Sequence, residues 1–196
     1  MVIHQQSMTF EEDIIESLIT LRKGGIILYP TDTIWGLGCD PTSPSAVEKV
    51  FRIKSRERSK SLLILVNSEQ MLERYVKDIP EIAFELTSVS DKPLTVIYKA
   101  GKNLATGVCS EDGSIGIRIC RDEFCNELIK RFCKPIVSTS ANFSGKPSPG
   151  NFSEIDDLLI EAADYVVKYR QDDRRKYSSS PVIKLSPDGT IKIIRK

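Results

Sequence analysis

Three polar clusters contain the residues that could do chemistry, and each lies where an apolar run ends. The first is the Thr- and Gly-rich segment 30–38, the second is the basic run 52–60, and the third is the Ser- and Asn-rich segment 138–148. Their hydroxyl, amide, ammonium and guanidinium groups are suited to binding and polarising phosphates and carboxylates. Since sheet proteins place ligand sites at the ends of strands and helices, each cluster is a candidate ligand site.

Each cluster also has an ordinary structural explanation. In segment 30–38 the Thr and Asp side chains could cap their own backbone amides, and Gly36-Leu-Gly38 is only half of a dinucleotide-binding fingerprint. The run 52–60 could be a solvated face, or a set of cations that complements the dipole of a helix C-terminus. Segment 138–148 would by itself be a Ser/Gly/Pro loop. The residue types alone leave these alternatives open.

The single histidine narrows the classes of catalysis. His4 lies near the N-terminus, whereas Ser-His-Asp and Cys-His mechanisms need an imidazole beside the nucleophile. The five cysteines form no CxxC pair and are odd in number, which favours reduced thiols and disfavours a zinc site built on Cys and His. Any chemistry is therefore expected to use Lys, Arg, Ser, Thr, Asn, carboxylates and backbone amides.

Length and composition indicate one globular domain. The chain has 196 residues, with 28 Lys and Arg against 27 Asp and Glu, and a formal net charge of +1. This balance excludes the overall basic charge of a nucleic-acid coat protein, although a local basic patch remains compatible with it. No apolar stretch approaches the roughly 20 residues of a membrane span, and the N-terminus does not resemble a signal peptide. We therefore expect a cytoplasmic protein.

Apolar runs and helix caps predict the elements that hold the clusters. A capping box at Thr9–Glu12 predicts the start of a first helix that Gly24-Gly25 ends, and Ser43-Pro44 predicts the start of a second helix. The predicted strands are 26–29, 62–66, 94–98, 114–119, 135–139, 165–168, 182–185 and 190–194, and the further helices are 68–76, 80–90, 123–133 and 153–163. The polar segment 171–180 indicates a mobile linker or flap. The pattern is typical of a single α/β domain, 1–196, with a twisted mixed parallel and antiparallel sheet flanked by helices.

Together, the three clusters resemble the signature of the YrdC/TsaC family, the L-threonylcarbamoyl-adenylate synthases of tRNA modification. Pro-Thr-Asp-Thr-Ile-Trp-Gly-Leu at 30–37 is followed by Lys54-x-Arg56, and then by Ser140-x-Asn142 with Ser-Gly-Lys-Pro-Ser at 144–148. The resemblance extends from the first helix to Arg195. It implies one YrdC-like domain with a concave ligand face and without the extra C-terminal domain of longer relatives.

The resemblance implies a nucleotidyl transfer. L-Threonine, bicarbonate and ATP, with Mg²⁺ as the cofactor, would give threonylcarbamoyl-AMP and pyrophosphate, and a partner transferase complex would move the threonylcarbamoyl group onto tRNA. Direct contact with tRNA is a further candidate interaction, and no membrane partner is expected. Such a transfer depends mostly on positioning and on neutralising negative charge, so it requires no imidazole.

The resemblance also implies roles for individual residues, with Lys54 and Arg56 as the catalytic cations. The residues expected to bind ATP are Arg56, Lys60, Ser114, Ser140, Asn142, Ser148 and Arg195. Those expected to bind threonine are Thr33, Arg118, Ser138 and Ser180, with the Arg118 guanidinium on the carboxylate, and the metal ligands stay unassigned. If Lys54 and Arg56 lie in a polar site outside the core, replacing either with Ala should abolish activity with little loss of stability.

Several positions depart from the family pattern. Glu57 and Ser61 stand where the family usually has prolines, which predicts a more mobile loop and a weaker positive field. Trp35 replaces a usual Tyr and keeps an aromatic wall. Leu65 replaces a His of some relatives, which affects one threonine contact, and Pro181 replaces a usual Thr.

Two other functions remain compatible with the sequence. A non-catalytic module that holds tRNA or structured RNA would use the run 52–60, although the net charge of +1 disfavours it. A domain that handles carbamoyl-adenylate, as in hydrogenase-maturation proteins, would occur inside a much larger chain. Stabilisation by ATP with threonine would favour the enzyme, whereas stabilisation by tRNA alone would favour the RNA-binding module.

Overall fold

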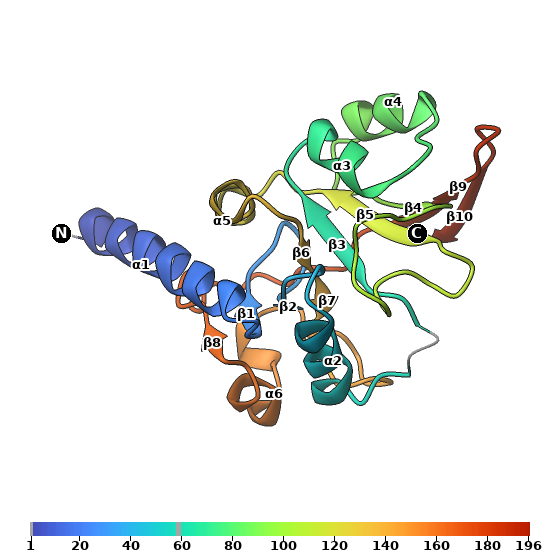
Figure 1. Cartoon of the computed structure of the whole chain (residues 1–196). Coiled ribbons are helices and arrows are strands. Elements are labelled where there is room, and N and C mark those ends of the chain that lie inside the picture. The colour runs from blue at the N-terminus through green and yellow to red at the C-terminus, as the bar shows by residue number, and fades with distance from the viewer. Residues whose placement is uncertain (1, 58–59) are drawn as a thin grey trace.

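Short apolar strands form two mixed sheets in the computed structural model, which describes residues 2–57 and 60–196, with side chains from residue 9 onward (Figure 1). The four-stranded sheet has the order β7-β2-β1-β8 and the six-stranded sheet the order β10-β9-β4-β5-β3-β6. The first consists of β1 (Ile27–Tyr29), β2 (Gly36–Gly38), β7 (Thr139–Ser140) and β8 (Tyr165–Val166). The second consists of β3 (Leu63–Val66), β4 (Thr95–Tyr98), β5 (Ile115–Ile119), β6 (Ile136–Val137), β9 (Val182–Leu185) and β10 (Ile191–Arg195). The predicted α/β class with mixed parallel and antiparallel pairing is confirmed.

The strand predicted at 135–139 is shared between the two sheets. Its first half, β6, pairs antiparallel with β3, and its second half, β7, pairs antiparallel with β2. At the junction the Ser138 amide donates to the Leu63 carbonyl at 2.9 Å. Gly38 lies close beside this strand, because a Cβ there would meet the Tyr29 ring at 2.6 Å and the Val137 carbonyl at 2.9 Å. The sequence predicted one sheet, whereas the change of partners at the junction gives two.

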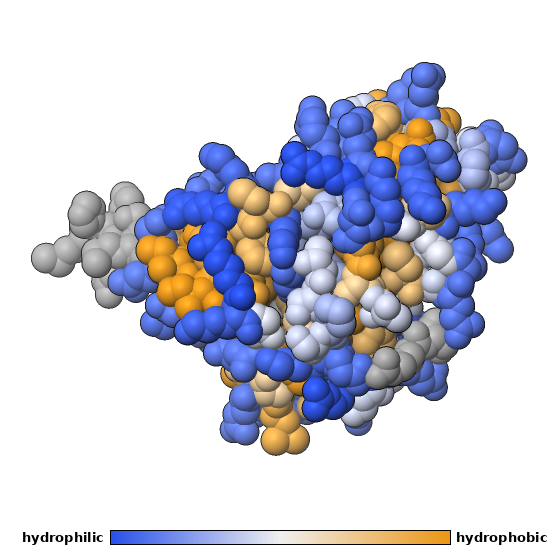
Figure 2. Space-filling view, viewed as in Figure 1, coloured by the Kyte–Doolittle hydropathy of each residue, from blue (hydrophilic) through white to orange (hydrophobic). Residues whose placement is uncertain are grey.

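Six α-helices accompany the sheets in the described part of the chain, and local side-chain caps mark the starts of several of them. The α-helices are α1 (Val2–Arg22), α2 (Pro44–Ile53), α3 (Glu69–Tyr75), α4 (Ile82–Val89), α5 (Glu123–Phe132) and α6 (Asp157–Glu161). The Ser43 side chain caps α2 at the Ala46 amide, and the Asp122 side chain caps α5 at the Cys125 amide. Helices α3 and α4 lie together beside the six-stranded sheet, whereas α1 projects from the four-stranded sheet and contacts α5 (Figure 1). Figure 2 shows apolar side chains gathered over α1, which exposes Ile15 and Ile19.

Two helix boundaries differ from the prediction. Helix α1 begins at Val2, so the predicted start at Thr9 is wrong. A capping sequence starts a helix only where the preceding backbone is not helical, and here the helix already runs through Thr9. The helix predicted at 153–163 is divided into a 3₁₀ turn, Phe152–Glu154, and α6. Asp156 makes this break, since it is extended and its side chain accepts from the Leu158 amide.

The segment 171–180, predicted as a mobile flap, carries no helix or strand but is joined to the domain by several hydrogen bonds. The carboxylate of Asp13, which is 0% exposed, accepts from the amides of Lys168 and Tyr169 and from the Tyr165 hydroxyl at 2.6–3.1 Å. Further along, the Tyr177 amide donates to the Gly150 carbonyl at 2.9 Å. Asp13 therefore fixes the point at which this segment leaves the four-stranded sheet.

Among the residues that the structure describes, no helix combines the length and the apolar character needed to cross a membrane. The five cysteines are free thiols, of which Cys39, Cys120 and Cys125 are buried.

We expect Asp13→Ala to lower the free energy of unfolding by about 3 kcal/mol, because buried donors lose a charged acceptor. Urea denaturation measures the loss. Glu12→Ala, one residue away on the exposed face of α1, is the matched control and should change stability by less than about 0.5 kcal/mol. Equal losses for the two variants would contradict the role given to Asp13.

Candidate functional site

A polar cleft with about 680 Å³ of empty volume lies where the two sheets meet. Its walls come from the loop before β2, the start of β3, the middle of β5, the β6–β7 junction, the residues before β9 and the end of β10. Eight of the residues expected to bind substrates line it: Thr33, Arg56, Arg118, Ser138, Ser140, Ser148, Ser180 and Arg195. Residues up to about 160 positions apart in the sequence therefore meet in one cavity, with hydroxyls and three guanidinium groups in its wall.

Arg118 is buried in the wall of the cleft, with only 3% of its surface exposed. Its neighbours Ile115 and Ile117 on β5 are also buried, so both faces of this strand are covered. One terminal nitrogen, Nη1, donates to the Ser180 hydroxyl at 3.2 Å, and the other, Nη2, lies 3.0 Å from a carboxylate oxygen of Asp32. A buried guanidinium is tolerated when it is paired in this way.

Ser180 joins three strands at one end of the cleft. Its hydroxyl accepts from Arg118 and makes a 2.8 Å hydrogen bond with the Thr95 hydroxyl on β4. Its carbonyl accepts from Nε and Nη2 of Arg195 on β10, at 3.0 and 2.7 Å. Burial, together with the charge of Arg118, lowers the pKa of the Arg195 guanidinium. Ser180 therefore holds two guanidinium groups close together, and such a pair attracts anions.

The loop at 31–34 is ordered by hydroxyl groups and not by its carboxylate. The Thr31 hydroxyl donates to the Ile34 carbonyl at 2.8 Å and accepts from the Thr33 amide at 3.1 Å. Since the only hydroxyl proton of Thr31 is used in this way, Thr33 must donate in the 3.1 Å bond between the two hydroxyls. The lone pairs of Thr33 consequently remain available to accept from a molecule in the cleft.

Lys54 lies beneath the cleft and not in its wall. Its side chain is 1% exposed, and its Nζ donates to the carbonyls of Ser140 and Asn142, the latter at 2.6 Å. Burial, and then the charge of Arg56, lowers the pKa of the Lys54 ammonium to about 7. The expectation that Lys54 occupies a polar position outside the core is wrong, because two backbone carbonyls draw its ammonium inward. Lys54 thus shapes the loop that follows β7.

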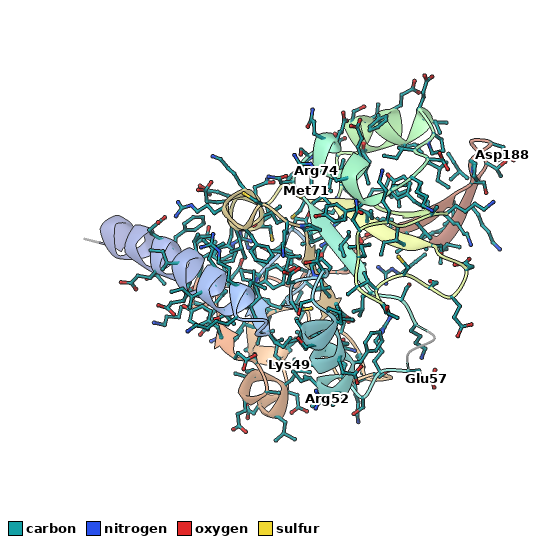
Figure 3. The ribbon with its side chains drawn as sticks, viewed as in Figure 1. Lys49, Arg52, Glu57, Met71, Arg74 and Asp188 are labelled. Atoms are coloured by element: carbon teal, nitrogen blue, oxygen red, sulfur yellow. The ribbon has the colours of Figure 1, made fainter. Side chains whose placement is uncertain are left out.

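The basic run 52–60 does not form one charged face. Arg56 lines the cleft and donates to the Lys60 and Ser61 carbonyls at 3.2 and 2.8 Å, and burial lowers its pKa. Arg52 and Glu57 instead point outward from α2 and from the loop after it (Figure 3). Arg58, a member of this run, lies outside the described residues.

Three residues expected to bind ATP do not line the cleft in the structure. Lys60 is exposed, and its ammonium lies 3.7 Å from the Glu57 carboxylate. Ser114 precedes β5, and its hydroxyl donates to Asp112 at 2.5 Å. Asn142 uses its amide nitrogen on the Phe143 and Lys146 carbonyls, whereas its side-chain oxygen is buried without a hydrogen-bond partner among the described residues. Their contact with ATP stays a prediction.

The structure adds two residues that the sequence did not single out. Asp32 pairs with Arg118, although in the sequence its carboxylate was equally compatible with local capping of the loop. Thr95 lies inside a predicted strand, and its type and position gave no signal that its hydroxyl would meet Ser180. Both contacts join residues 85 or 86 positions apart in the chain.

Comparisons with known proteins show the family to which the chain belongs. The chain matches the Sua5/YciO/YrdC family, described as telomere recombination, over residues 20–196. A protein of Stenotrophomonas maltophilia (strain K279a) named threonylcarbamoyl-AMP synthase is 34% identical over 155 residues, which cover 77% of this chain and 83% of that protein.

Two solved structures are also similar. The crystal structure of P. abyssi Sua5 complexed with L-threonine is 26% identical, with a TM-score of 0.78 over 88% of this chain and 50% of that one. This chain therefore spans about half the length of that protein. The crystal structure of E. coli YciO is 23% identical, with a TM-score of 0.77 over 97% of this chain and 89% of that one, and supports the fold alone.

We expect Lys54→Met to lower the free energy of unfolding by about 2 kcal/mol near pH 7, since two carbonyls lose their donor. The loss should be larger near pH 9. Between about pH 7 and 10 the unfolded chain keeps a Lys54 proton that the folded chain releases, so this group makes the wild-type protein more stable as pH rises.

Urea denaturation at the two pH values measures both effects. Lys60→Met, which changes an exposed lysine of the same run, is the control and should alter stability little at either pH. A Lys54→Met variant as stable as this control would contradict the buried position of Lys54.

Proposed function

Because the chain belongs to the Sua5/YciO/YrdC family, we propose that it is a threonylcarbamoyl-AMP synthase, which uses L-threonine, bicarbonate and ATP and releases pyrophosphate. This reaction is the first step in forming N6-threonylcarbamoyladenosine in tRNA. The enzyme is a nucleotidyltransferase, because the adenylyl group passes from ATP to an oxygen of the N-carboxylated amino acid. The observation that carries the proposal is the single cleft in which eight of the expected binding residues meet.

Threonine would bind at the end of the cleft formed by Arg118, Ser180, Ser138 and Thr33. The guanidinium of Arg118 can take the amino-acid carboxylate through two parallel N–H donors, a geometry that a lysine ammonium does not offer. The Thr33 hydroxyl has lone pairs to accept from the substrate, and Ser138 supplies a further hydroxyl from the β6–β7 junction. The solved structure of P. abyssi Sua5 with L-threonine supports this class of substrate.

ATP would occupy the rest of the cleft, next to Arg56, Arg195, Ser140 and Ser148. In nucleotidyl transfer the negative charge on the phosphates spreads as the pyrophosphate leaves, and fixed cations stabilise that charge. Arg56 and Arg195 are both held by backbone carbonyls, so their positions do not have to be organised during the reaction. Lys54 would support catalysis from below by holding the Ser140–Asn142 loop.

We expect Mg²⁺ to enter the cleft with ATP. No group of three or more His, Cys, Asp or Glu side chains within the described ranges is arranged to hold a metal ion. The wall of the cleft instead offers hydroxyls and guanidinium groups. Bound to the nucleotide, Mg²⁺ would supply charge neutralisation for the phosphates.

The proposed reaction also defines the partners. The product must pass to a threonylcarbamoyl transferase that modifies tRNA, and such a pathway fits a cytoplasmic protein. The alternative of a non-catalytic RNA-binding module has less support, since the basic run is divided between inward and outward positions. Direct contact with tRNA stays a prediction.

The purified protein should form threonylcarbamoyl-AMP and pyrophosphate only when threonine, bicarbonate, ATP and Mg²⁺ are all present. Mass spectrometry identifies the adenylate, and omission of each reactant in turn is the control. A folded protein that yields no adenylate, and that tRNA alone stabilises against thermal unfolding, would favour the RNA-binding alternative.

Arg118→Lys should raise the threonine requirement at least about tenfold and leave the ATP requirement nearly unchanged, because charge-assisted bonds of this type contribute roughly 1.5–3 kcal/mol. Separate titrations of threonine and of ATP measure the two requirements in the variant and in the wild-type protein. Arg131→Lys, which alters an arginine paired with Glu11 outside the cleft, is the matched control and should change neither requirement. Equal losses for both substrates with Arg118→Lys would show that this residue does not hold the carboxylate.

A further inference from the structure

We propose that Asp32 is a positioning residue that fixes the guanidinium of Arg118 in the orientation in which it receives the amino-acid carboxylate. The inference rests on the proposed function and extends it by a residue to which neither the motif nor the comparisons give a role. It follows from the contacts of Asp32, from the shape of the guanidinium and from the different cavities that the two side chains line.

Asp32 pairs with Arg118 and takes no part in ordering its own loop. Its Oδ1 lies 3.0 Å from Nη2 of Arg118, and the two side chains are 11% and 3% exposed. The Thr33 amide, a donor that a capping carboxylate would take, already donates to the Thr31 hydroxyl at 3.1 Å. Within the described residues the buried Oδ1 atom of Asp32 makes no hydrogen bond, so its contact with Nη2 is an ion pair that acts through charge and proximity.

The guanidinium of Arg118 has a hydrogen bond at Nη1 and an ion pair at Nη2, and these two contacts, together with its bond to the rest of the side chain, restrict its rotation. Ser180 holds Nη1 and Asp32 holds Nη2. The Nε atom is buried without a partner among the described residues, and the neighbour of Arg118 on β3 is Leu65, an apolar side chain. Without Asp32, the Ser180 hydroxyl would be the single fixed point, and the planar fork could rotate away from the cleft.

Asp32 and Arg118 line different cavities. Asp32 lines a second cavity, with about 600 Å³ of empty volume, whose wall includes residues 90–94, Ile119, Arg121 and Asp122, whereas Arg118 lines the substrate cleft. The ion pair thus separates the two cavities. The carboxylate of Asp32 can hold the guanidinium without occupying the space that a substrate needs, which defines a positioning role rather than a catalytic one.

Charge and orientation give opposite expectations for the loss of Asp32. A carboxylate beside Arg118 reduces the positive potential in the cleft, so if charge alone mattered, Asp32→Ala would strengthen threonine binding. If orientation matters, the same change weakens it. Asp32→Asn keeps an acceptor oxygen without the charge and should therefore retain more of the threonine affinity than Asp32→Ala does.

The test measures the KM for threonine, the KM for ATP and kcat, with direct titration of threonine by calorimetry. Asp32→Ala should raise the KM for threonine about tenfold or more while the KM for ATP stays within about twofold, and Asp32→Asn should fall between it and the wild type. In an Arg118→Lys background, Asp32→Ala should add less than about twofold, because it acts through the guanidinium.

Asp40→Ala is the matched control. It breaks another partly buried ion pair, with Lys134 at 2.7 Å, at a position outside the cleft, so it should reduce stability without changing the KM for threonine. An unchanged or lower KM for threonine in Asp32→Ala, or an equal rise for ATP, would overturn the proposal. A wild-type protein that binds threonine in calorimetry but forms no adenylate would instead refute the proposed function and leave the binding test of Asp32 intact.

Discussion

The charge of Arg118, buried between two layers, is the constraint on which the site depends. A guanidinium loses much of its hydration when only 3% of its surface stays exposed, and nearby polar or charged partners must offset that cost. Those partners come from separate parts of the chain, with Asp32 in the loop before β2 and Ser180 before β9. The loop, the central strand and the C-terminal hairpin must therefore assemble together for the charge to be tolerated.

The same requirement to pair buried polar groups shapes the other side of the cleft. The backbone leaves the six-stranded sheet at Val137 and enters the four-stranded sheet at Thr139, and it turns away again after Ser140, the last residue of β7. Lys54, at the end of α2, donates hydrogen bonds to the carbonyls of Ser140 and Asn142. Burial lowers the pKa of its ammonium to about 7. A neutral amine still has two N–H groups, which are sufficient for the two carbonyls. Lys54 can thus hold the loop on either side of neutral pH.

The composition of the cleft matches the chemistry that we propose for it. Arginines stay charged when they are partly buried, whereas lysines and carboxylates tend to become neutral, so three arginines provide a lasting positive field for phosphates and a carboxylate. Hydroxyl groups from the loop before β2 and from the β6–β7 junction add hydrogen-bond donors and acceptors to the wall of the cleft. A site built in this way acts by positioning its substrates and stabilising charge, and it needs no imidazole.

The sequence by itself determined the features that depend on neighbouring residues. The cap at Ser43, the start of α2 at Pro44 and the buried runs of β3 and β5 follow from local hydrogen bonding and side-chain pattern, and most of the predicted elements are present. The family motifs also located eight residues of the cleft. The exact start of α1 and the break before α6 were missed because a capping sequence does not show whether the backbone before it is already helical.

Only the tertiary structure decided which charges are buried and what pairs with them. The division into two sheets follows from hydrogen bonds between β6 and β3 and between β7 and β2, which join segments far apart in the chain. Lys54 turned inward because the carbonyls of residues 140 and 142 lie beside it. Asp32 pairs with Arg118 because the fold brings their side chains within 3.0 Å of each other. Burial and pairing depend on what the fold brings within a few ångströms, and a residue's type and its neighbours in sequence do not contain that information.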